Sequence, residues 1–495
     1  MLDVVERRPN SVFLALAGYF LLCIALRLTI SNSLEIDESE QAFLSQFLQL
    51  GYGPQAPFYN WLQYGLSQAI GPSLATMTLL KNGLLFLSCL FYGLAARLVL
   101  RDPRLAAMAM LGVLSLPPVF LLAQRDLSHT VAALFAVSLF LYGFLRTLTR
   151  PSLAAYLLTG LAVGIGAISK YNFVLVPVAA ILAILPERDL RARIFDWRIL
   201  AAIAVAALIA LPHGIWVLQN LDAASAGTLN EMKEREAEGR LLQAFHGVSG
   251  LVFAVIDGSF VTLILFGLVI RGKVLLVWQA ESLWTRIVGR TIALSLLAVL
   301  LIVLGVAATH IREKWLVLYL LLLPLYLCLK IEAAKIDPMP GFRLFAPLIA
   351  TIVLGALIIV SARAVVRPWF GNYSRLNIPY ARFAEALEKS EGQQPAFVLT
   401  NDKQVAGNVR TQFADATVAM PSRMDWIAVE AAKRPLLVVW HDKADAEPQV
   451  PGTLKPALKQ MGVAMSGVTP QELSLPYLYG SKADRYGFRY IWVDE

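Results

Sequence analysis

Long apolar runs separated by short polar loops occupy the first 362 residues of the 495-residue chain. A hydrocarbon core about 30 Å thick needs roughly 20 apolar residues per helix, and this criterion predicts about eleven spans. No small-residue cleavage site follows the first run, so we interpret it as a span and not as a signal peptide. The expected spans lie near 11–30, 80–99, 105–123, 127–145, 153–168, 171–186, 199–218, 250–270, 288–308, 315–330 and 343–362.

Two polar segments within this region are too long to be simple connectors. In residues 31–76, apolar side chains recur at helical spacing on both sides of a turn at 51–57, which predicts two interfacial helices. Residues 219–249 contain the charged run EMKEREAEGR and predict a mobile or amphipathic loop. Residues 274–286 are also amphipathic, and we expect them to lie in the headgroup layer.

The remaining residues, 363–495, have the composition of an ordinary soluble domain. The pattern predicts helices at 382–390 and 406–413 and strands at 396–402, 436–442 and 486–495. Alternating strands and helices favour a small α/β sandwich. No glycine-rich nucleotide motif occurs in it, so we expect a binding or lid role. The expected division is thus a transmembrane domain, 1–362, followed by this α/β domain.

Composition supports the membrane assignment and limits the cofactors. The chain is 57% hydrophobic and 16% charged, whereas soluble proteins carry about 25% charged residues. Its cysteines, Cys23, Cys89 and Cys328, all fall within expected spans, so the α/β domain uses no disulfide. No Cys/His metal spacing is present. We therefore expect no certain cofactor, and a divalent metal remains an open alternative.

The distribution of basic residues predicts the orientation. Lys and Arg collect in alternate loops, as they do on the cytoplasmic side of membrane proteins, and residues 31–76 contain neither. We expect a cytoplasmic N-terminus in a bacterial inner membrane. An odd number of spans then makes the α/β domain periplasmic. The net charge of +8 is divided among many short loops, which disfavours nucleic-acid binding.

An acidic pair, Asp37 and Glu38, follows the first span in a loop without nearby basic residues in sequence. The pair is consistent with solvated loop charges or with a helix cap near Ser39. It is equally consistent with a general base, because partial burial at a membrane boundary raises a carboxyl pKa and a carboxylate can deprotonate a sugar hydroxyl. Both interpretations remain open at this stage.

Aromatic and polar groups on the same side of the membrane form further candidates. Tyr59 and Trp61 follow the 51–57 turn; they fit an interfacial aromatic belt or a stacking platform for a sugar. The turn QRDLSHT contributes Arg125, Asp126 and His129, where Asp126 also fits a helix N-cap paired with Arg125.

Three cations stand out on this side, where most turns have almost none. Lys170 lies at a tight turn between two apolar spans, where a charge is costly unless it snorkels or binds a lipid phosphate. Arg312 and Lys314 belong to the turn HIREKW. Tyr171 adjoins Lys170, and His213 ends the seventh span; Arg27 and His213 also fit purely structural roles. Together with the acidic pair, these groups suit a reaction between a lipid phosphate and a hydroxyl acceptor.

With these motifs in order, the chain resembles the polytopic GT-C glycosyltransferases of the protein-mannosyltransferase-like group. Lipid A aminoarabinose transferase and the rhizobial lipopolysaccharide galacturonosyltransferases are the most similar types. The resemblance rests on the pair Asp37-Glu38, on 55–61 in place of the His/Lys-Pro-Pro-x-x-x-Trp element, and on GLAVGIGAISKY, LPHGIW and KWLVLYLLLLP. Gln55 replaces a basic residue and Ala56 a proline; Asp126 and His129 stand where many relatives have Thr-x-Asp.

The resemblance implies an inverting glycosyltransferase that takes a sugar from a polyprenyl-phosphate donor. The acceptor would be a hydroxyl of an envelope glycolipid, such as lipopolysaccharide or lipid A, or of a glycan. In this assignment Asp37, with Glu38, is the catalytic base, and Lys170, Arg312 and Lys314 bind the donor phosphate. Substrate-binding residues would be Tyr59, Trp61, Arg125, Asp126, His129, Tyr171 and His213. The alternatives are a transporter or flippase of lipid-linked sugars, a protein O-glycosyltransferase, and an outer-face receptor.

Overall fold

The computed structural model describes residues 11–225, 239–427, 433–441, 449–463 and 469–494. The backbone contacts divide the chain into two units. Unit one comprises Met1–Leu21, Gln49–Tyr59 and Gly83–Leu357, and unit two comprises Leu22–Leu48, Asn60–Asn82 and Ile358–Glu495. The C-terminal segment of unit two thus begins close to the boundary expected from the sequence. Unit two also contains most of the first long polar segment.

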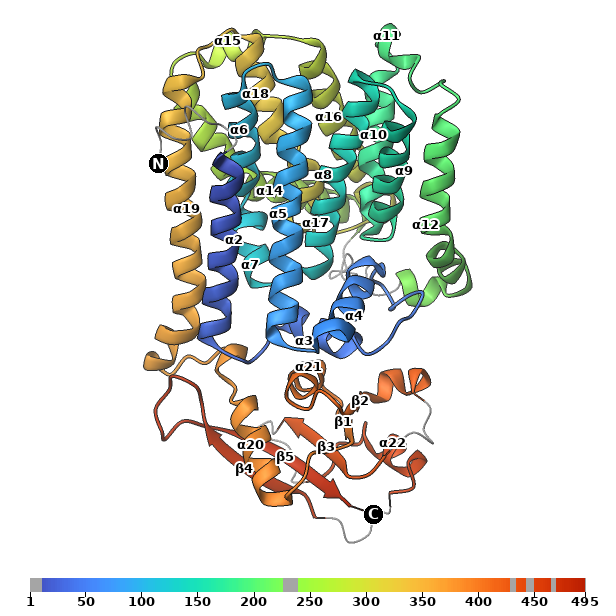
Figure 1. Ribbon diagram of the computed structural model, residues 1–495, viewed down its shortest axis with the longest axis vertical. Coiled ribbons are helices and arrows are strands. Elements are labelled where there is room, and N and C mark those ends of the chain that lie inside the picture. Colours follow the sequence, from blue (N-terminus) through green and yellow to red (C-terminus); the bar gives the residue numbers. More distant parts are fainter. Residues whose placement is uncertain (1–10, 226–238, 428–432, 442–448, 464–468, 495) are drawn as a thin grey trace. The chain divides into compact units, whose positions relative to one another are not determined.

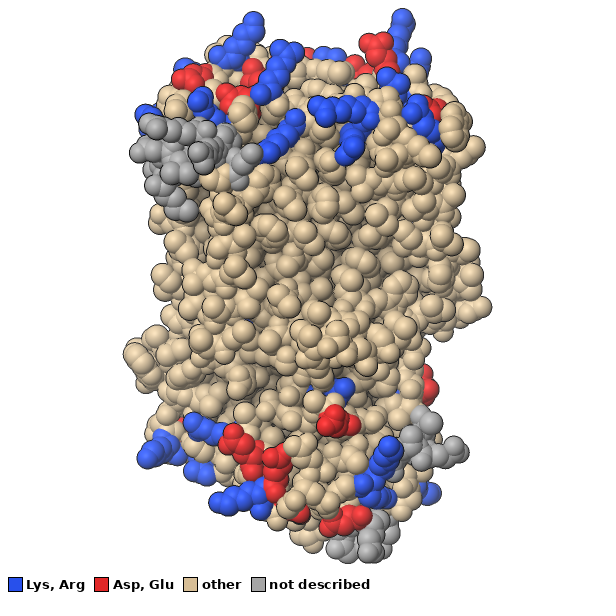
Figure 2. All heavy atoms as spheres, viewed as in Figure 1, with Lys and Arg blue, Asp and Glu red and all other residues tan. Residues whose placement is uncertain are grey.

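Among the described residues, eight of the eleven expected spans correspond to helices that are long and apolar enough to cross a membrane. On the viewed face, Lys, Arg, Asp and Glu are absent from the middle of the helical bundle (Figure 2). The eight are α2 (Ser11–Ile30), α5 (Leu74–Val99), α8 (Ser128–Thr149), α12 (Ile199–Gln219), α14 (Arg240–Ile270), α16 (Leu283–Gly305), α17 with α18 (Glu313–Leu320 and Leu323–Ala333), and α19 (Met339–Val366).

The other three expected spans are helical but bent or short. In the third, α6 (Pro103–Gly112) and η1 (Val113–Ser115) meet η2 (Pro118–Leu122) and α7 (Ala123–Arg125) at 61°. The bend falls at Pro117 and Pro118, which lack the N–H that a straight helix needs. The fifth and sixth spans are α9 (Leu153–Ala167) and the short pair η3 (Tyr171–Val174) and α10 (Leu175–Ile184).

The long polar segments are more helical than simple loops. The 31–76 segment contains α3 (Ile36–Leu44) and α4 (Phe58–Ile70), which confirms the two predicted helices. Helix α14 begins at Arg240, ten residues before the expected span, and residues 226–238 of the expected loop lie outside the described part of the chain. Two short helices, α11 (Arg188–Arg191) and α15 (Val274–Gln279), follow α10 and α14.

Unit two contains a mixed five-stranded sheet of order β2-β1-β3-β5-β4. Strands β1 (Phe397–Leu399), β3 (Leu436–His441) and β5 (Arg485–Val493) confirm the three predicted strands. Strand β1 runs parallel to β2 (Thr417–Ala419) and β3, with Val398 opposite Val418 and Leu437. Strand β5 is antiparallel to β3 and to β4 (Gln471–Pro476). The two strands that the pattern missed are the edge strands, and edges are short or polar because one side is unpaired.

Side chains along β5 point alternately to the two faces of this sheet, and a different helix covers each face. Phe488 stacks on Phe383 of α20 (Tyr380–Glu391), with ring centroids 4.4 Å apart. Ile491 instead joins a buried cluster with Leu454 and with Leu458 of α22 (Lys455–Gln460). Side chains that are an odd number of residues apart on a strand point to opposite faces, so α20 and α22 cover different faces. Both predicted helices are present, as α20 and α21 (Lys403–Gln412).

Helix α3 is fixed by a buried ion-pair network within unit two. Glu38 accepts hydrogen bonds from Arg27 Nη2 of α2 at 2.7 Å and from Lys81 Nζ of α5 at 3.1 Å. Glu35, the N-cap residue, pairs with Arg363 of α19. Glu38 also accepts the backbone N–H of Glu35 at 3.0 Å. Because each charge in this buried cluster has a partner, the network joins α3 to three apolar helices.

We expect Glu38→Gln to destabilise the protein by about 3–5 kcal/mol, because it leaves the charges of Arg27 and Lys81 without their buried carboxylate. Glu40→Gln on the same helix is the matched control, since Glu40 pairs with Lys403 at 3.5 Å where both side chains are more than a third exposed. That substitution should cost about 1 kcal/mol or less. Thermal unfolding of both variants in detergent tests the expectation, and equal losses would contradict it.

The effect of Glu38→Gln should not vary between pH 5 and 8. Burial acts to raise the pKa of Glu38, but the charges of Arg27 and Lys81 outweigh it and hold the pKa well below 4.5. A carboxyl with a lowered pKa stabilises the fold above its unfolded pKa and loses that contribution only as the pH falls toward the folded value.

Candidate active site

The turn that carries Lys170 is fixed from several sides within unit one. Lys170 follows α9, and its Nζ donates to Thr130 Oγ1 of α8 at 3.0 Å and to the carbonyl oxygen of Lys314 at 3.5 Å. Asn172 Nδ2 donates to the carbonyl oxygen of Trp315 at 2.9 Å. These uncharged acceptors orient the half-buried ammonium group. The structure therefore brings Lys170 and the Lys314 turn together.

The second cationic turn, residues 310–315, begins α17. Arg312 is the N-cap residue of α17, and its Nε donates to His310 Nε2 at 3.0 Å. Arg312 and Lys314 are half-buried. Tyr319, on the next turn of α17, donates from its hydroxyl to the carbonyl oxygen of Asn172 at 3.0 Å. Backbone and side-chain hydrogen bonds thus connect both cation-bearing turns, which creates a site suited to an anion such as a phosphate ester.

The QRDLSHT turn lies beside this cluster. Thr130, the acceptor for Lys170, directly follows His129, and the His129 ring lies 5.9 Å from the ring of Tyr59. Arg125 is exposed and Asp126 is half-buried. Leu127, the residue before α8, has a φ of 82°, a strained conformation for a branched side chain. The nearby segment η2 is a π-helix, and a π-helix close to a strained residue is typical of functional sites.

Three aromatic rings form a stack in the same unit. His213 lies between Tyr171 and Trp216, with centroids 5.8 and 5.7 Å away and planes within 13°. His213 Nδ1 lies 2.7 Å from the carbonyl oxygen of Leu50, which can only accept, so Nδ1 carries the proton. In the neutral ring, Nε2 then accepts from the Tyr171 hydroxyl at 3.2 Å. A Cβ at Gly51 would overlap the Trp216 ring, so the 51–57 turn requires glycine there.

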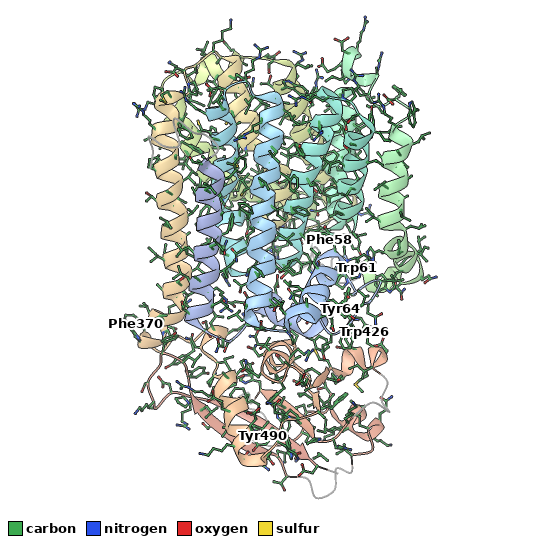
Figure 3. The ribbon with its side chains drawn as sticks, viewed as in Figure 1. Phe58, Trp61, Tyr64, Phe370, Trp426 and Tyr490 are labelled. Carbon is green, nitrogen blue, oxygen red and sulfur yellow. The ribbon has the colours of Figure 1, made fainter. Side chains whose placement is uncertain are left out.

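The aromatic residues of α4 form a row along one side of the helix. Phe58, Trp61 and Tyr64 are spaced three residues apart and are each half-buried (Figure 3). Asn60 Nδ2, on another side, donates to Gln41 Oε1 of α3 at 3.0 Å. Such a row fits both interpretations made from the sequence, a membrane-interface belt and a platform for a sugar ring.

The two residues of the acidic pair have different surroundings in unit two. Asp37 lies in the first turn of α3 and is half-buried, whereas Glu38 is buried in the ion-pair network. The lowered pKa of Glu38 makes it a poor proton acceptor. Glu38 is thus held in a structural ion-pair network, whereas the neighbouring carboxylate of Asp37 is partly exposed.

Helix α21 of the α/β domain holds α3 directly, a contact that the sequence analysis missed. Asn408 Oδ1 accepts the N–H of Leu34 at 2.9 Å, and Asn408 Nδ2 donates to Ser39 Oγ at 3.2 Å. Gln404 donates to the carbonyl oxygen of Leu34. A Cβ at Gly407 would overlap the Ser39 backbone, so only glycine permits this approach. The signal available in the sequence was the pair of side-chain amides, Gln404 and Asn408, on one side of this helix.

Gln46 ties the end of the same segment to the sheet. Its side-chain oxygen accepts the N–H of Val418 at 2.8 Å, and its nitrogen donates to the Val418 carbonyl at 3.3 Å. Phe47 packs on the domain core, 5.6 Å from the Trp426 ring. The amide of Gln46 thus covers part of edge strand β2, which would otherwise present unpaired backbone groups.

No group of three or more His, Cys, Asp or Glu side chains in the described ranges is placed to hold a metal ion.

Known proteins share this architecture. Residues 54–216 match the family described as dolichyl-phosphate-mannose-protein mannosyltransferase. Lipopolysaccharide core galacturonosyltransferase RgtA of Rhizobium johnstonii is 43% identical over 498 residues, covering 100% of this chain and 99% of RgtA. Lipopolysaccharide core galacturonosyltransferase RgtB of the same organism is 42% identical over 495 residues, 100% of both chains.

The fold is similar to that of ArnT from Cupriavidus metallidurans. The crystal structure of ArnT bound to undecaprenyl phosphate matches with a TM-score of 0.60 at 13% identity, over 96% of this chain and 97% of ArnT. At that identity the similarity concerns the fold alone. Because two relatives match the whole chain at 43% and 42% identity, the protein belongs to the family of GT-C membrane glycosyltransferases that includes RgtA and RgtB.

Proposed function

We propose that this glycosyltransferase moves a sugar from a polyprenyl-phosphate donor to a hydroxyl of an envelope glycolipid, with inversion at the anomeric carbon. The observation that carries the proposal is the cluster of Lys170 with Thr130 and the Lys314 turn, an anion site beside the aromatic residues Tyr59 and His129. The names of RgtA and RgtB support galacturonic acid as the sugar and the lipopolysaccharide core as the acceptor. ArnT with undecaprenyl phosphate supports the donor class.

In this mechanism Asp37 accepts the proton of the acceptor hydroxyl. The acceptor oxygen attacks the anomeric carbon while the bond from that carbon to the phosphate oxygen breaks. A phosphodiester with one negative charge becomes a phosphomonoester with two. Lys170, Arg312 and Lys314 stabilise the added charge, and pre-positioned cations of this kind usually supply a large part of catalysis.

The remaining residues bind the two substrates. Trp61 and Tyr171, which are partly exposed, offer ring faces to the sugar, and His213 fixes the hydroxyl of Tyr171. Tyr59 is buried beside the His129 ring and positions that side of the site. Arg125, Asp126 and His129 lie on one turn and offer hydrogen-bonding groups to hydroxyls or to a uronate. Asp37 belongs to unit two, and the three cations belong to unit one. The role of each rests on the contacts within its own unit.

Asp37→Asn should lower the turnover number by about 10²–10⁴, because the amide cannot accept the proton. Its melting temperature should stay near wild type, in contrast to Glu38→Gln. The measurement is transfer from a synthetic polyprenyl-phosphate sugar to purified lipopolysaccharide. Wild-type turnover by Asp37→Asn would exclude Asp37 as the base.

Lys170→Ala should weaken donor binding and slow turnover together, since one charge serves both the ground state and the transition state. Lys170→Arg should restore only part of the activity, because a planar guanidinium presents its donors differently from an ammonium group. Exposed Lys273, between α14 and α15, is the control, and Lys273→Ala should bind donor as wild type does. Donor binding in nanodiscs decides the matter: unchanged affinity in Lys170→Ala would remove Lys170 from the phosphate site.

We further propose that the N-terminus is cytoplasmic and that the α/β domain is periplasmic in a bacterial inner membrane. The support is the excess of Lys and Arg on alternate loops. Alkaline phosphatase fused after Glu495 should therefore be active, because the enzyme requires export. An inactive phosphatase, together with an active cytosolic reporter at the same position, would reverse the orientation.

A further inference from the structure

An apolar cavity of about 250 Å³ lies in unit one, between α8, α9, α10 and α12. Helix α9 packs against both α8 and α12 in the bundle (Figure 1). Val174, Val178 and Ile203 line the cavity and are also each more than a third exposed. The cavity therefore opens on a surface that faces lipid in a membrane protein, and an acyl chain is the chemical group that fits its walls.

Arg193 forms the charged end of this cavity. Its backbone carbonyl accepts the hydroxyl of Tyr156, in the first turn of α9, at 2.7 Å. Its Nε is buried, and no hydrogen-bond acceptor for this atom occurs among the residues that the structure describes. A buried donor without an acceptor is costly, so the position favours an anionic ligand. Neighbouring Arg198 is paired with Asp196 at 2.6 Å; the same carboxylate also attracts Arg193, but it forms no hydrogen bond with Arg193 Nε.

The segment around Arg193 has the features of a membrane interface. Residues 188–198 contain four arginines and two aspartates. Phe195 and Trp197 are 75% and 70% exposed, as aromatic side chains at the headgroup level are. Basic pockets between membrane helices at this depth recognise anionic lipid headgroups.

This charged end is far from the proposed donor site along the same helix. Tyr156 lies eleven positions before the end of α9 at Ala167, which corresponds to about 16 Å at the α-helical rise, and Lys170 lies beyond that end. One phosphate group cannot contact both Arg193 and Lys170 over that distance. The two cations therefore require two different phosphate groups.

We propose that the cavity binds an anionic phospholipid, with one acyl chain between α9, α10 and α12 and the phosphate at Arg193. This site is separate from the donor site, and its occupant takes no part in the transfer. The lipid supplies the acceptor that Arg193 Nε needs and fills the apolar space that the four helices leave.

The test is binding of spin-labelled phosphatidylglycerol to the purified protein in phosphatidylcholine nanodiscs. Arg193→Gln should weaken binding about tenfold, because a charge-assisted hydrogen bond is lost. Arg188→Gln is the matched control: Arg188 is exposed on the same segment and does not line the cavity, so its affinity should stay near wild type. Val178→Trp, at a half-exposed position, should abolish binding by filling the space, with its melting temperature retained.

Three outcomes would overturn the proposal. Equal losses in Arg193→Gln and Arg188→Gln would indicate diffuse attraction by surface charge. Equal competition by unlabelled phosphatidylcholine would show that the headgroup is not recognised. Stronger competition by a polyprenyl phosphate would assign the cavity to the donor. None of these measurements requires turnover, so they are independent of the proposed transferase mechanism.

Discussion

A charge that is removed from water must be paired, and this constraint determines where α3 lies. Glu38 lies between Arg27 and Lys81, and Glu35 pairs with Arg363, so two carboxylates on one short helix face cations from three apolar helices. Each pairing is favourable only in one geometry, because the desolvation cost is recovered only by close contact. The position of Asp37, one residue before Glu38, follows from that geometry. The ion pairs of Glu38 thus fix the position of the neighbouring carboxylate.

The helices and the central strands were predictable because their hydrophobic patterns are strong. All eleven expected spans are helical, and β1, β3 and β5 occur where buried apolar runs predicted them. The bend at Pro117 and Pro118 and the two short spans were missed, since an average over twenty residues does not register local chain geometry. Edge strand β4, QELSLP, was missed because its exposed polar residues carry no buried pattern.

The candidate site was only partly predictable for a different reason. Lys170, Arg312 and Lys314 stand out in sequence as charges between apolar runs, and in the structure Lys170 Nζ donates to the carbonyl oxygen of Lys314. Thr130 and Asn172 were not predicted, because a hydroxyl and an amide are ordinary residues until a partner far along the chain is known. The resemblance assigned Asp37 as the base with Glu38 beside it, but nothing in the sequence indicated that Glu38 pairs with Arg27 and Lys81.

The glycine at 407 has a consequence for how such enzymes diversify. Because glycine has no side chain, α21 can approach the backbone of Ser39 closely. Asn408 then forms hydrogen bonds with the backbone N–H of Leu34 and the hydroxyl of Ser39. The α/β domain and the 31–48 segment are therefore complementary surfaces that must change together. A chimaera that exchanges this domain between two relatives should retain a well-formed α3 only if that segment is transferred with it. Recombination inside the gene is thus constrained to inherit two distant stretches of sequence as one module.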